Sequence, residues 1–403
     1  MKSDFWKFFV GETISNFGTS VTQFALPLIV FKISGSAVAL GAAAAMATVP
    51  HLLFGLFIGA WTDRTDRKRL MISVDVLSAL TIASIPVAAA LGILSVGWIV
   101  AVTFLMSLLS IFFQASEFGA IPSLVDQSDL VTANGRVQAS FAAATVVGPL
   151  AGGALLAFLP LEWLLYGDGA SFLVSAVALA LIRVPFNAPI ARRATSLRED
   201  VIEGLRYVLR HPVLRNISLM MALINITSIT TYVQLVLFAE RELGATDSQV
   251  GILFGAGGVG IFVCGLLAGP LRKRWSFGDV ALGALMLSGL LTVAFAYTTS
   301  FWIGAVIWGL SAGLGTLFNI NTGSLRQSIV PNQMLGRVIS IAMVLAWSAN
   351  PIGAVGGGFL IERLGDVRLI YAAIGLVTFL IALAFRVFSP LGHAERYLEV
   401  RAA

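Results

Sequence analysis

Hydrophobic residues in this chain gather in long blocks, and short polar segments separate the blocks. Each block is close to the length of about 20 apolar residues that an α-helix needs to cross a bilayer. The pattern therefore predicts twelve membrane-spanning helices. The predicted spans are residues 9–31, 37–61, 70–93, 96–119, 137–159, 163–184, 213–239, 248–271, 276–298, 300–323, 335–361 and 368–388.

Composition supports a membrane protein. Only 12% of the residues are charged and 58% are hydrophobic, whereas about 25% are charged in a typical soluble domain. The first block contains Asn16 and Gln23 and has no cleavage site of small residues, so we expect a retained span rather than a signal peptide. The chain is predicted to be an all-α polytopic membrane protein.

The basic residues predict how the chain is oriented. The net charge of +5 lies in short loops between apolar blocks, which favours membrane topology over nucleic-acid binding. If both termini are cytoplasmic, all but four of the 26 Lys and Arg residues lie on the cytoplasmic side. The four exceptions are Lys32, Arg241, Arg363 and Arg368. We expect a multi-pass protein of the inner (plasma) membrane, a monomer, with both termini in the cytoplasm.

A weak internal repeat divides the chain into halves. "IPSLVDQSDLVTANGRV" leads to "VVGPLAGG" in the first half, and "RQSIVPNQMLGRV" leads to "NPIGAVGGG" in the second. Duplicated six-span halves are typical of transporters, and a single-pore channel or a membrane enzyme would not need them. We predict two pseudo-symmetric six-helix bundles at 1–186 and 213–389, with a linker at 187–212 and a cytoplasmic tail at 390–403.

The predicted linker contains an amphipathic helix. Leu197, Val201, Leu205 and Val208 recur at helical spacing among charged residues, and Ser196 is a suitable N-cap. This helix could lie along the inner leaflet or serve as a solvated linker.

Polar residues form a stripe on the first span. Glu12, Asn16, Thr19 and Gln23 are spaced by four, three and four residues, so they fall within an arc of about 60° on a helix. Polar groups in hydrocarbon cost several kcal/mol unless they find partners or water. We expect the stripe to line a cavity, and interhelical hydrogen bonds are the alternative interpretation.

The fourth and tenth spans have similar stripes. Glu117 and Arg326 stand at nearly corresponding ends of the two halves, so we hypothesise that they form a charge pair that closes the cavity on the cytoplasmic side. Alternatively, each side chain extends separately to the lipid headgroups. The stripes are Ser107, Ser110, Gln114 and Glu117 on the fourth span, and Ser311, Asn319, Thr322 and Arg326 on the tenth.

The remaining polar residues within the spans are weaker indicators of function than the stripes. His51 could carry a proton, although a packing role is commoner for such a residue. Asp75 and Asp168 lie near span ends, where exposure at the membrane interface accounts for them. The three histidines lack metal-ligand spacing, and the chain has no P-loop, GxSxG or HExxH motif. We therefore expect no metal, no cofactor, no enzymatic activity and no sensor role.

The loop after the second span has a specific arrangement, "GAWTDRTDRKR". It resembles the loop motif between spans two and three of the major facilitator superfamily, although Asp66 stands where that superfamily most often has Gly. The resemblance implies a charge lock that holds the cytoplasmic gate. The matching residues are Gly59, Asp63, Arg64, Arg67 and Lys68.

The fifth span contains "VVGPLAGG", which is similar to the Gly-Pro motif of the exporter branches of this superfamily. Proline removes a helix hydrogen bond and glycines allow tight packing, so we expect a bend at the interface of the halves. Ala144 replaces the usual upstream Gly. The matching residues are Gly148, Pro149, Gly152 and Gly153.

Further stretches, including "EGLRYVLRHPVLR" and "RQSIVPNQMLGRVISI", resemble the branch with macrolide efflux proteins and the enterobactin exporter. The resemblance implies a secondary active exporter that moves an amphipathic small molecule, such as a drug or siderophore, against proton entry. In this scheme we expect Glu12 to be protonated and ionised in turn, with Glu117 as a second candidate. We expect neutral or basic residues at these two positions in many relatives, so the resemblance does not carry a coupling role over to Glu12 and Glu117. Uptake by proton symport is the alternative.

Overall fold

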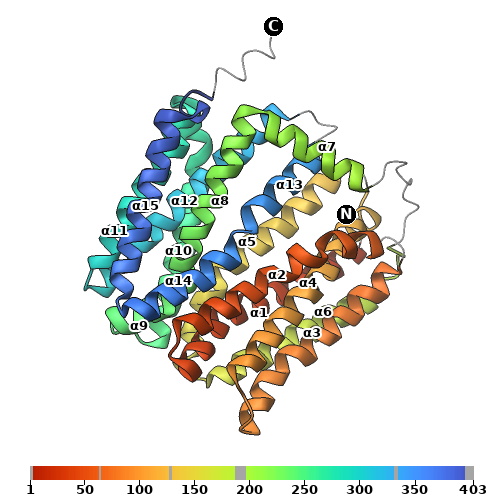
Figure 1. Cartoon of the computed structure of the whole chain (residues 1–403). Coiled ribbons are helices and arrows are strands. Elements are labelled where there is room, and N and C mark those ends of the chain that lie inside the picture. The colour runs from red at the N-terminus through yellow and green to blue at the C-terminus, as the bar shows by residue number, and fades with distance from the viewer. Residues whose placement is uncertain (1–2, 63–64, 127–128, 187–196, 331–334, 395–403) are drawn as a thin grey trace. The chain divides into compact units, whose positions relative to one another are not determined.

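A computed structural model describes residues 3–62, 65–126, 129–186, 197–330 and 335–394 (Figure 1). Within these ranges the chain is helical and has no strand. Among the described residues, twelve helical stretches are long and apolar enough to cross a membrane, which confirms the predicted number of spans. Six helices make up the first half: α1 (Ser3–Ser34), α2 (Ala37–Thr62), α3 (Arg67–Ala90), α4 (Val96–Leu124), α5 (Leu130–Leu155) and α6 (Leu161–Ala180).

The second half has more helical segments because some of its spans are interrupted. Its elements are α7 (Leu197–Arg210), α8 (Pro212–Val233), α9 (Leu235–Glu242), α10 (Asp247–Arg274), the π-helical turn η2 (Gly278–Leu282), α11 (Gly283–Tyr297), α12 (Phe301–Ile329), α13 (Leu335–Trp347), α14 (Asn350–Leu364), α15 (Val367–Phe388) and the short helix η3 (Pro390–His393).

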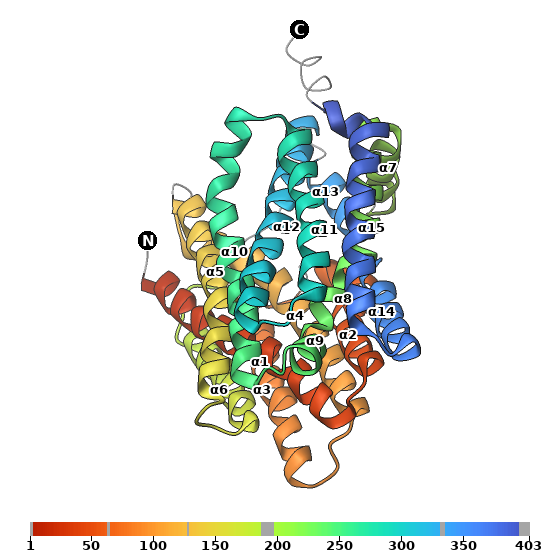
Figure 2. The ribbon, with the colours of Figure 1, turned by 90° about the vertical axis from the view of Figure 1, so that its left-hand side faces the viewer.

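The chain forms two compact units that repeat the same packing. The first comprises residues 1–191 and 246–255, and the second comprises 192–245 and 256–403. In the first unit α1 packs on α5 and α6, and α3 packs on α4 and α6. In the second, α8 packs on α14 and α15, and α11 packs on α12 and α15, with α11 and α15 side by side in Figure 1 and Figure 2. The exact limits of the bundles, linker and tail remain predictions.

The eleventh span differs from the sequence prediction of one helix over 335–361. The structure breaks it into α13, which ends at Trp347, and α14, which begins at Asn350. Pro351 lies at the first turn of α14. Because proline has no backbone N–H, it cannot donate to the carbonyl of Trp347, and a break is stabilised at this point.

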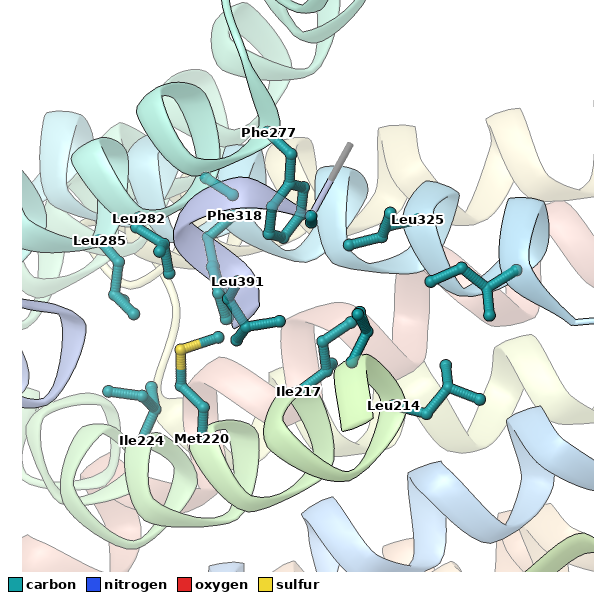
Figure 3. Close-up of a cluster of buried hydrophobic side chains, with 14 of the residues drawn as sticks. Leu214, Ile217, Met220, Ile224, Phe277, Leu282, Leu285, Phe318, Leu325 and Leu391 are labelled. Atoms are coloured by element: carbon teal, nitrogen blue, oxygen red, sulfur yellow. The ribbon is translucent and has the colours of Figure 1, made fainter. Parts of the chain in front are cut away.

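Apolar side chains lie both inside the units and on their outer faces. In the second unit, side chains of α8 point toward α12 and Leu391 (Figure 3). Leu80, Val306 and Leu376 are more than half exposed. An apolar exterior is expected of helices that face lipid. The labelled core residues are Leu214, Ile217, Met220, Ile224, Phe277, Leu282, Leu285, Phe318, Leu325 and Leu391.

The helix predicted in the linker is α7, and it belongs to the second unit. Val208 is buried in the same core cluster as Leu214 and Ile217, and α7 packs on α8 and α13. The proposed N-cap, Ser196, lies outside the described residues. The helix is therefore held against the protein by its apolar face, rather than standing free as a solvated linker.

Candidate functional site

A pair of carboxyl groups lies inside the first unit. Glu12 of α1 is only 8% exposed, and its carboxyl group lies against that of Glu117 on α4 and beside Asn16. The Oε2 atom of Glu12 has no hydrogen-bond partner among the described residues. Two adjacent carboxylates repel each other, and a hydrogen bond between them requires a proton. A hydrogen bond within this pair would therefore need a proton on one of the two carboxyl groups.

Two further carboxyl groups are buried in the same unit, and for these the sequence interpretation was wrong. Asp75 and Asp168 were expected to be exposed at the membrane interface, but each is only 1% exposed. Asp75 lies eight residues into α3 and Asp168 seven residues into α6, about 10 Å or more from the helix ends. Both face the interior of the bundle rather than lipid or headgroups.

Hydroxyl groups surround these two aspartates. The Ser171 hydroxyl donates to Asp168 Oδ1 at 3.2 Å, and Thr19 of α1 lies beside the same carboxyl group. Asp75 lies beside Ser175 of α6 and close to Glu12. A signal for Asp75 was present in the sequence, because it continues a spacing of four, three and four residues. The other members of that series are Met71, Ser78 and Ile82, all of them buried.

The remaining residues of the predicted stripes differ in exposure. Asn16 and Thr19 are half-buried, while Gln23 on α1 and Gln114 on α4 are exposed. The structure therefore brings the Glu12 end of the first stripe together with Glu117, and leaves Gln23 on an open face. The cavity-lining role of the stripes remains a prediction.

The second unit contains a buried guanidinium. Arg326 of α12 is 7% exposed, its Nη2 lies 3.1 Å from the sulfur of Met221, and its Nε has no partner among the described residues. The Thr322 hydroxyl donates to the carbonyl of Phe318 at 2.9 Å, so it is satisfied within its own helix. Asn319 is exposed. A pair of Glu117 with Arg326 would join the two units and stays a prediction.

His51 makes a contact between two helices, and the described residues contain no group suited to a metal ion. His51 Nδ1 lies 3.1 Å from the Ser107 hydroxyl, which donates to the carbonyl of Ala47 at 2.7 Å. This arrangement links α2 to α4, as expected of a packing histidine. Among the described residues, no group of three or more His, Cys, Asp or Glu side chains could hold a metal ion.

Two basic residues of the loop motif bind backbone carbonyls at the end of α6 and in the segment after it. Lys68 donates to the carbonyls of Ala180 at 3.2 Å and Ile182 at 2.5 Å. Arg67 is buried and its Nη1 lies 3.5 Å from the carbonyl of Phe186. Carbonyls at a helix C-terminus lack helical donors and attract cations. Lys68 therefore ties the start of α3 to the end of α6, and Arg67 ties it to the segment that follows α6.

The other loop-motif residues are described only in part. Asp63 and Arg64 lie outside the described residues, and Gly59 lies within α2. Asp66, where the superfamily most often has Gly, is the N-cap of α3 and accepts from the backbone N–H of Arg69 at 3.1 Å. Aspartate in place of the usual Gly therefore has a structural effect here: as the N-cap residue it stabilises α3, the helix that follows.

The Gly-Pro motif packs α5 against α1. A Cβ at Gly148 would lie 2.5 Å from the Cβ of Ser20, and one at Gly152 would lie 2.8 Å from a ring carbon of Phe24. Gly153 packs on Gly251, within residues 246–255 of the same unit. The helix runs unbroken through Pro149. Close helix packing is thus the observed effect of the glycines, and the expected bend remains a prediction.

The second half repeats this packing. A Cβ at Gly353 of α14 would lie 2.8 Å from the carbonyl carbon of Ile226 on α8, and one at Gly357 would lie 2.7 Å from the Cβ of Thr230. The Thr230 hydroxyl donates to the carbonyl of Gly353 at 2.9 Å, just as Ser20 donates to a carbonyl of α5. The internal repeat is therefore a repeat of packing as well as of sequence.

Comparison with known families decides the class of protein. The model of the "transmembrane secretion effector" family, a branch of the major facilitator superfamily (MFS), matches residues 2–397. The chain belongs to this family. It is therefore an MFS transporter in a multi-pass membrane fold, and not an enzyme.

Relatives and solved structures of MFS transporters agree with this assignment. The chain is 26% identical to the multidrug efflux pump Tap of Mycolicibacterium fortuitum over 86% of this chain and 87% of the pump. It is 23% identical to macrolide efflux protein A of Streptococcus pyogenes (90% and 91%). It is 24% identical to the enterobactin exporter EntS of Salmonella typhimurium (86% and 83%).

In fold, the chain resembles two solved transporters. A bacterial homologue of the lysosomal transporter Spinster has a TM-score of 0.75 at 15% identity and covers 98% of this chain and 97% of its own. The nucleoside transporter NupG has a TM-score of 0.78 at 12% identity, covering 95% and 99%. These similarities show the major facilitator fold, as predicted.

Proposed function

We propose that this MFS transporter is a proton-coupled exporter of an amphipathic small molecule that works by alternating access. The observation that carries the proposal is the contact between the Glu12 and Glu117 carboxyl groups inside the first bundle. Carboxyl groups within a membrane protein are rare and often mark proton pathways. The efflux functions in the names of the relatives, and the Gly-Pro motif, favour export over uptake by symport.

Protonation of this pair can bias a conformational equilibrium. With a proton, Glu12 and Glu117 hydrogen-bond and hold α1 to α4; without it, two negative charges repel each other across the same contact. A proton that crosses the full membrane potential supplies about 2.3 kcal/mol per 100 mV. Such an energy suffices to shift a two-state cycle. The protein would act as a monomer in the plasma membrane with both termini in the cytoplasm.

The experiment compares the wild-type protein with Glu12→Gln in proteoliposomes that contain a macrolide and carry an imposed pH gradient. We expect Glu12→Gln to lose gradient-driven accumulation while it keeps macrolide exchange, because an amide cannot release a proton. Glu162→Gln is the matched control, since Glu162 is exposed in the first turn of α6. A Glu12→Gln protein with full gradient dependence would defeat the proposal. The direction of flux separates export from uptake.

Strains that lack or overproduce the protein identify the substrate class. We expect a shift in susceptibility to a macrolide or another amphipathic drug, or in the release of a siderophore. The cytoplasmic charge pair has its own test: Glu117→Arg combined with Arg326→Glu should restore the macrolide exchange that each single variant loses, while gradient-driven transport stays lost because the Glu12–Glu117 carboxyl pair is absent. Failure of this rescue would reject the pair and leave Glu117 with Glu12 alone.

A further inference from the structure

Arg326 on α12 is a buried charge for which the described residues supply no counter-charge. The residue is only 7% exposed. Its Nη2 atom lies 3.1 Å from the sulfur of Met221, a weak acceptor, and its Nε has no hydrogen-bond partner among the described residues. None of the ion pairs between described residues includes Arg326. Because a buried charge is costly unless it is paired, this guanidinium is suited to bind an anion.

Arg326 lies at one end of an open face of α12. Gly315, Asn319, Gly323 and Arg326 are spaced by four, four and three residues, so they fall within an arc of about 80°. Asn319 is exposed, and nothing lies within 4 Å of a Cβ at Gly315 or Gly323. The face is about 16 Å long, because an α-helix rises about 1.5 Å per residue. The guanidinium therefore has open space along its own helix.

The apolar exposed side of α12 is a different one. Trp302, Val306 and Leu310 are 65%, 63% and 50% exposed, and Val306 lies about 140° around the helix from Asn319. Exposed apolar side chains are expected toward lipid, whereas an exposed amide in hydrocarbon is costly. The open face that carries Asn319 and Arg326 therefore suits water or a ligand rather than lipid.

We propose that Arg326 binds the oxyanion group of a transported molecule, so that the substrates of this exporter include amphipathic acids. The inference rests on the proposed function and names a substrate class for it. A guanidinium is planar and can donate two parallel hydrogen bonds to a carboxylate, which an ammonium group cannot match. Open space beside Gly315 and Gly323 leaves room for the apolar part of such a ligand, and the flexible thioether of Met221 can adapt to its shape.

Two other anions compete as occupants of this guanidinium. One is the carboxylate of Glu117, the partner in the predicted charge pair, and the other is the phosphate of a lipid headgroup. The measurement is equilibrium dialysis of the full chain in nanodiscs of zwitterionic phosphatidylcholine, with empty nanodiscs as the blank. The three probes share one aromatic ring system and differ in the head group: naphthoate is an anion, naphthylmethanol is neutral and naphthylmethylammonium is a cation.

We expect the wild-type protein to bind naphthoate about tenfold more tightly than naphthylmethanol, because a hydrogen bond to a charged group adds that much affinity. Arg326→Met should abolish this preference, and Arg326→Lys should keep part of it. Arg215→Met is the matched control, since Arg215 is exposed at the start of α8, and it should leave the preference unchanged. If Arg326→Met does not fold, the comparison of head groups in the wild-type protein still decides the question.

Four outcomes would overturn the inference. Two of them are equal affinities of the wild-type protein for the three probes, and a preference for naphthoate that Arg326→Met retains. A preference that appears only in Glu117→Gln would identify Glu117 as the occupant. A difference between wild type and Arg326→Met that vanishes in nanodiscs of phosphatidylglycerol would identify a lipid headgroup instead.

The assay imposes no pH gradient, so it separates this inference from the proposed function. A wild-type protein without a preference for naphthoate rejects the anion site alone. A Glu12→Gln protein that keeps its full gradient dependence rejects the proposed function and leaves the affinity at Arg326 as measured.

Discussion

The tight contact between α5 and α1 makes Gly148→Ala an informative change. A Cβ at Gly148 would lie 2.5 Å from the Cβ of Ser20 and 3.1 Å from its carbonyl carbon, whereas carbon atoms in contact are about 3.5–4.0 Å apart. The helices must therefore separate by about 1 Å. Such overpacking costs about 1–3 kcal/mol, and it strains the hydrogen bond from the Ser20 hydroxyl to the Ala144 carbonyl, now 2.7 Å long.

Gly135→Ala is the matched control on the same helix. Nothing lies within 4 Å of a Cβ at Gly135, and alanine gains up to about 1 kcal/mol of helix propensity over glycine at either position. Because this gain is common to both variants, their free energies of unfolding should differ by the overpacking cost, about 1–3 kcal/mol.

Thermal unfolding in detergent and a denaturant titration in mixed micelles measure this difference. The second-site change Ser20→Gly removes the Cβ that Gly148→Ala meets, so it should recover part of the lost stability. Ser20→Ala removes only the Oγ, which also lies close to the added Cβ, and retains the Cβ of residue 20, so it should recover less stability than Ser20→Gly. If Gly148→Ala is as stable as Gly135→Ala, the packing argument for the Gly-Pro motif is refuted.

Three further changes test other contacts by thermal unfolding. Gly289→Ala should destabilise the protein by about 1–3 kcal/mol, because its Cβ would lie 2.6 Å from the carbonyl oxygen of Gly375 on α15, and a backbone atom cannot rotate away. Gly315→Ala is the control, because a Cβ at Gly315 would meet open space. Equal stability of the two variants would contradict the prediction. Asp66→Ala should cost about 1 kcal/mol by removing the N-cap of α3, and Asp66→Asn, which still caps, should restore most of it. Lys68→Met should cost about 1 kcal/mol by freeing two carbonyls at the end of α6; no change would mean that solvent replaces the lysine at no cost.

Much of the fold could be predicted because a bilayer imposes simple rules on sequence. Long apolar blocks, basic loops and a repeated Gly-rich helix were enough to predict twelve spans in two similar bundles. The break at Trp347 was missed because both sides of it are apolar, so hydrophobicity does not mark it. Proline at position 351 was the available signal, since it cannot donate a backbone hydrogen bond.

The candidate site was predicted less completely. Periodicity assigned Glu12 to a polar face of α1, but it did not show that Glu117 lies against it. Asp75 and Asp168 were placed at the interface by their distance from the span ends, and the structure buries both. On a membrane helix the lipid-facing and protein-facing sides are equally apolar, so the sequence contains little contrast that would orient each helix.

Sequence by itself determined what depends on one segment at a time: the number of spans, their internal repeat, the motifs and the membership of the MFS family. Only the tertiary structure decided which polar groups meet. Four carboxyl groups from four helices share the interior of one bundle because α1, α3, α4 and α6 pack there. A single carboxyl group in hydrocarbon has a high free-energy cost. Helix packing lowers this cost because it places polar groups beside each carboxyl group.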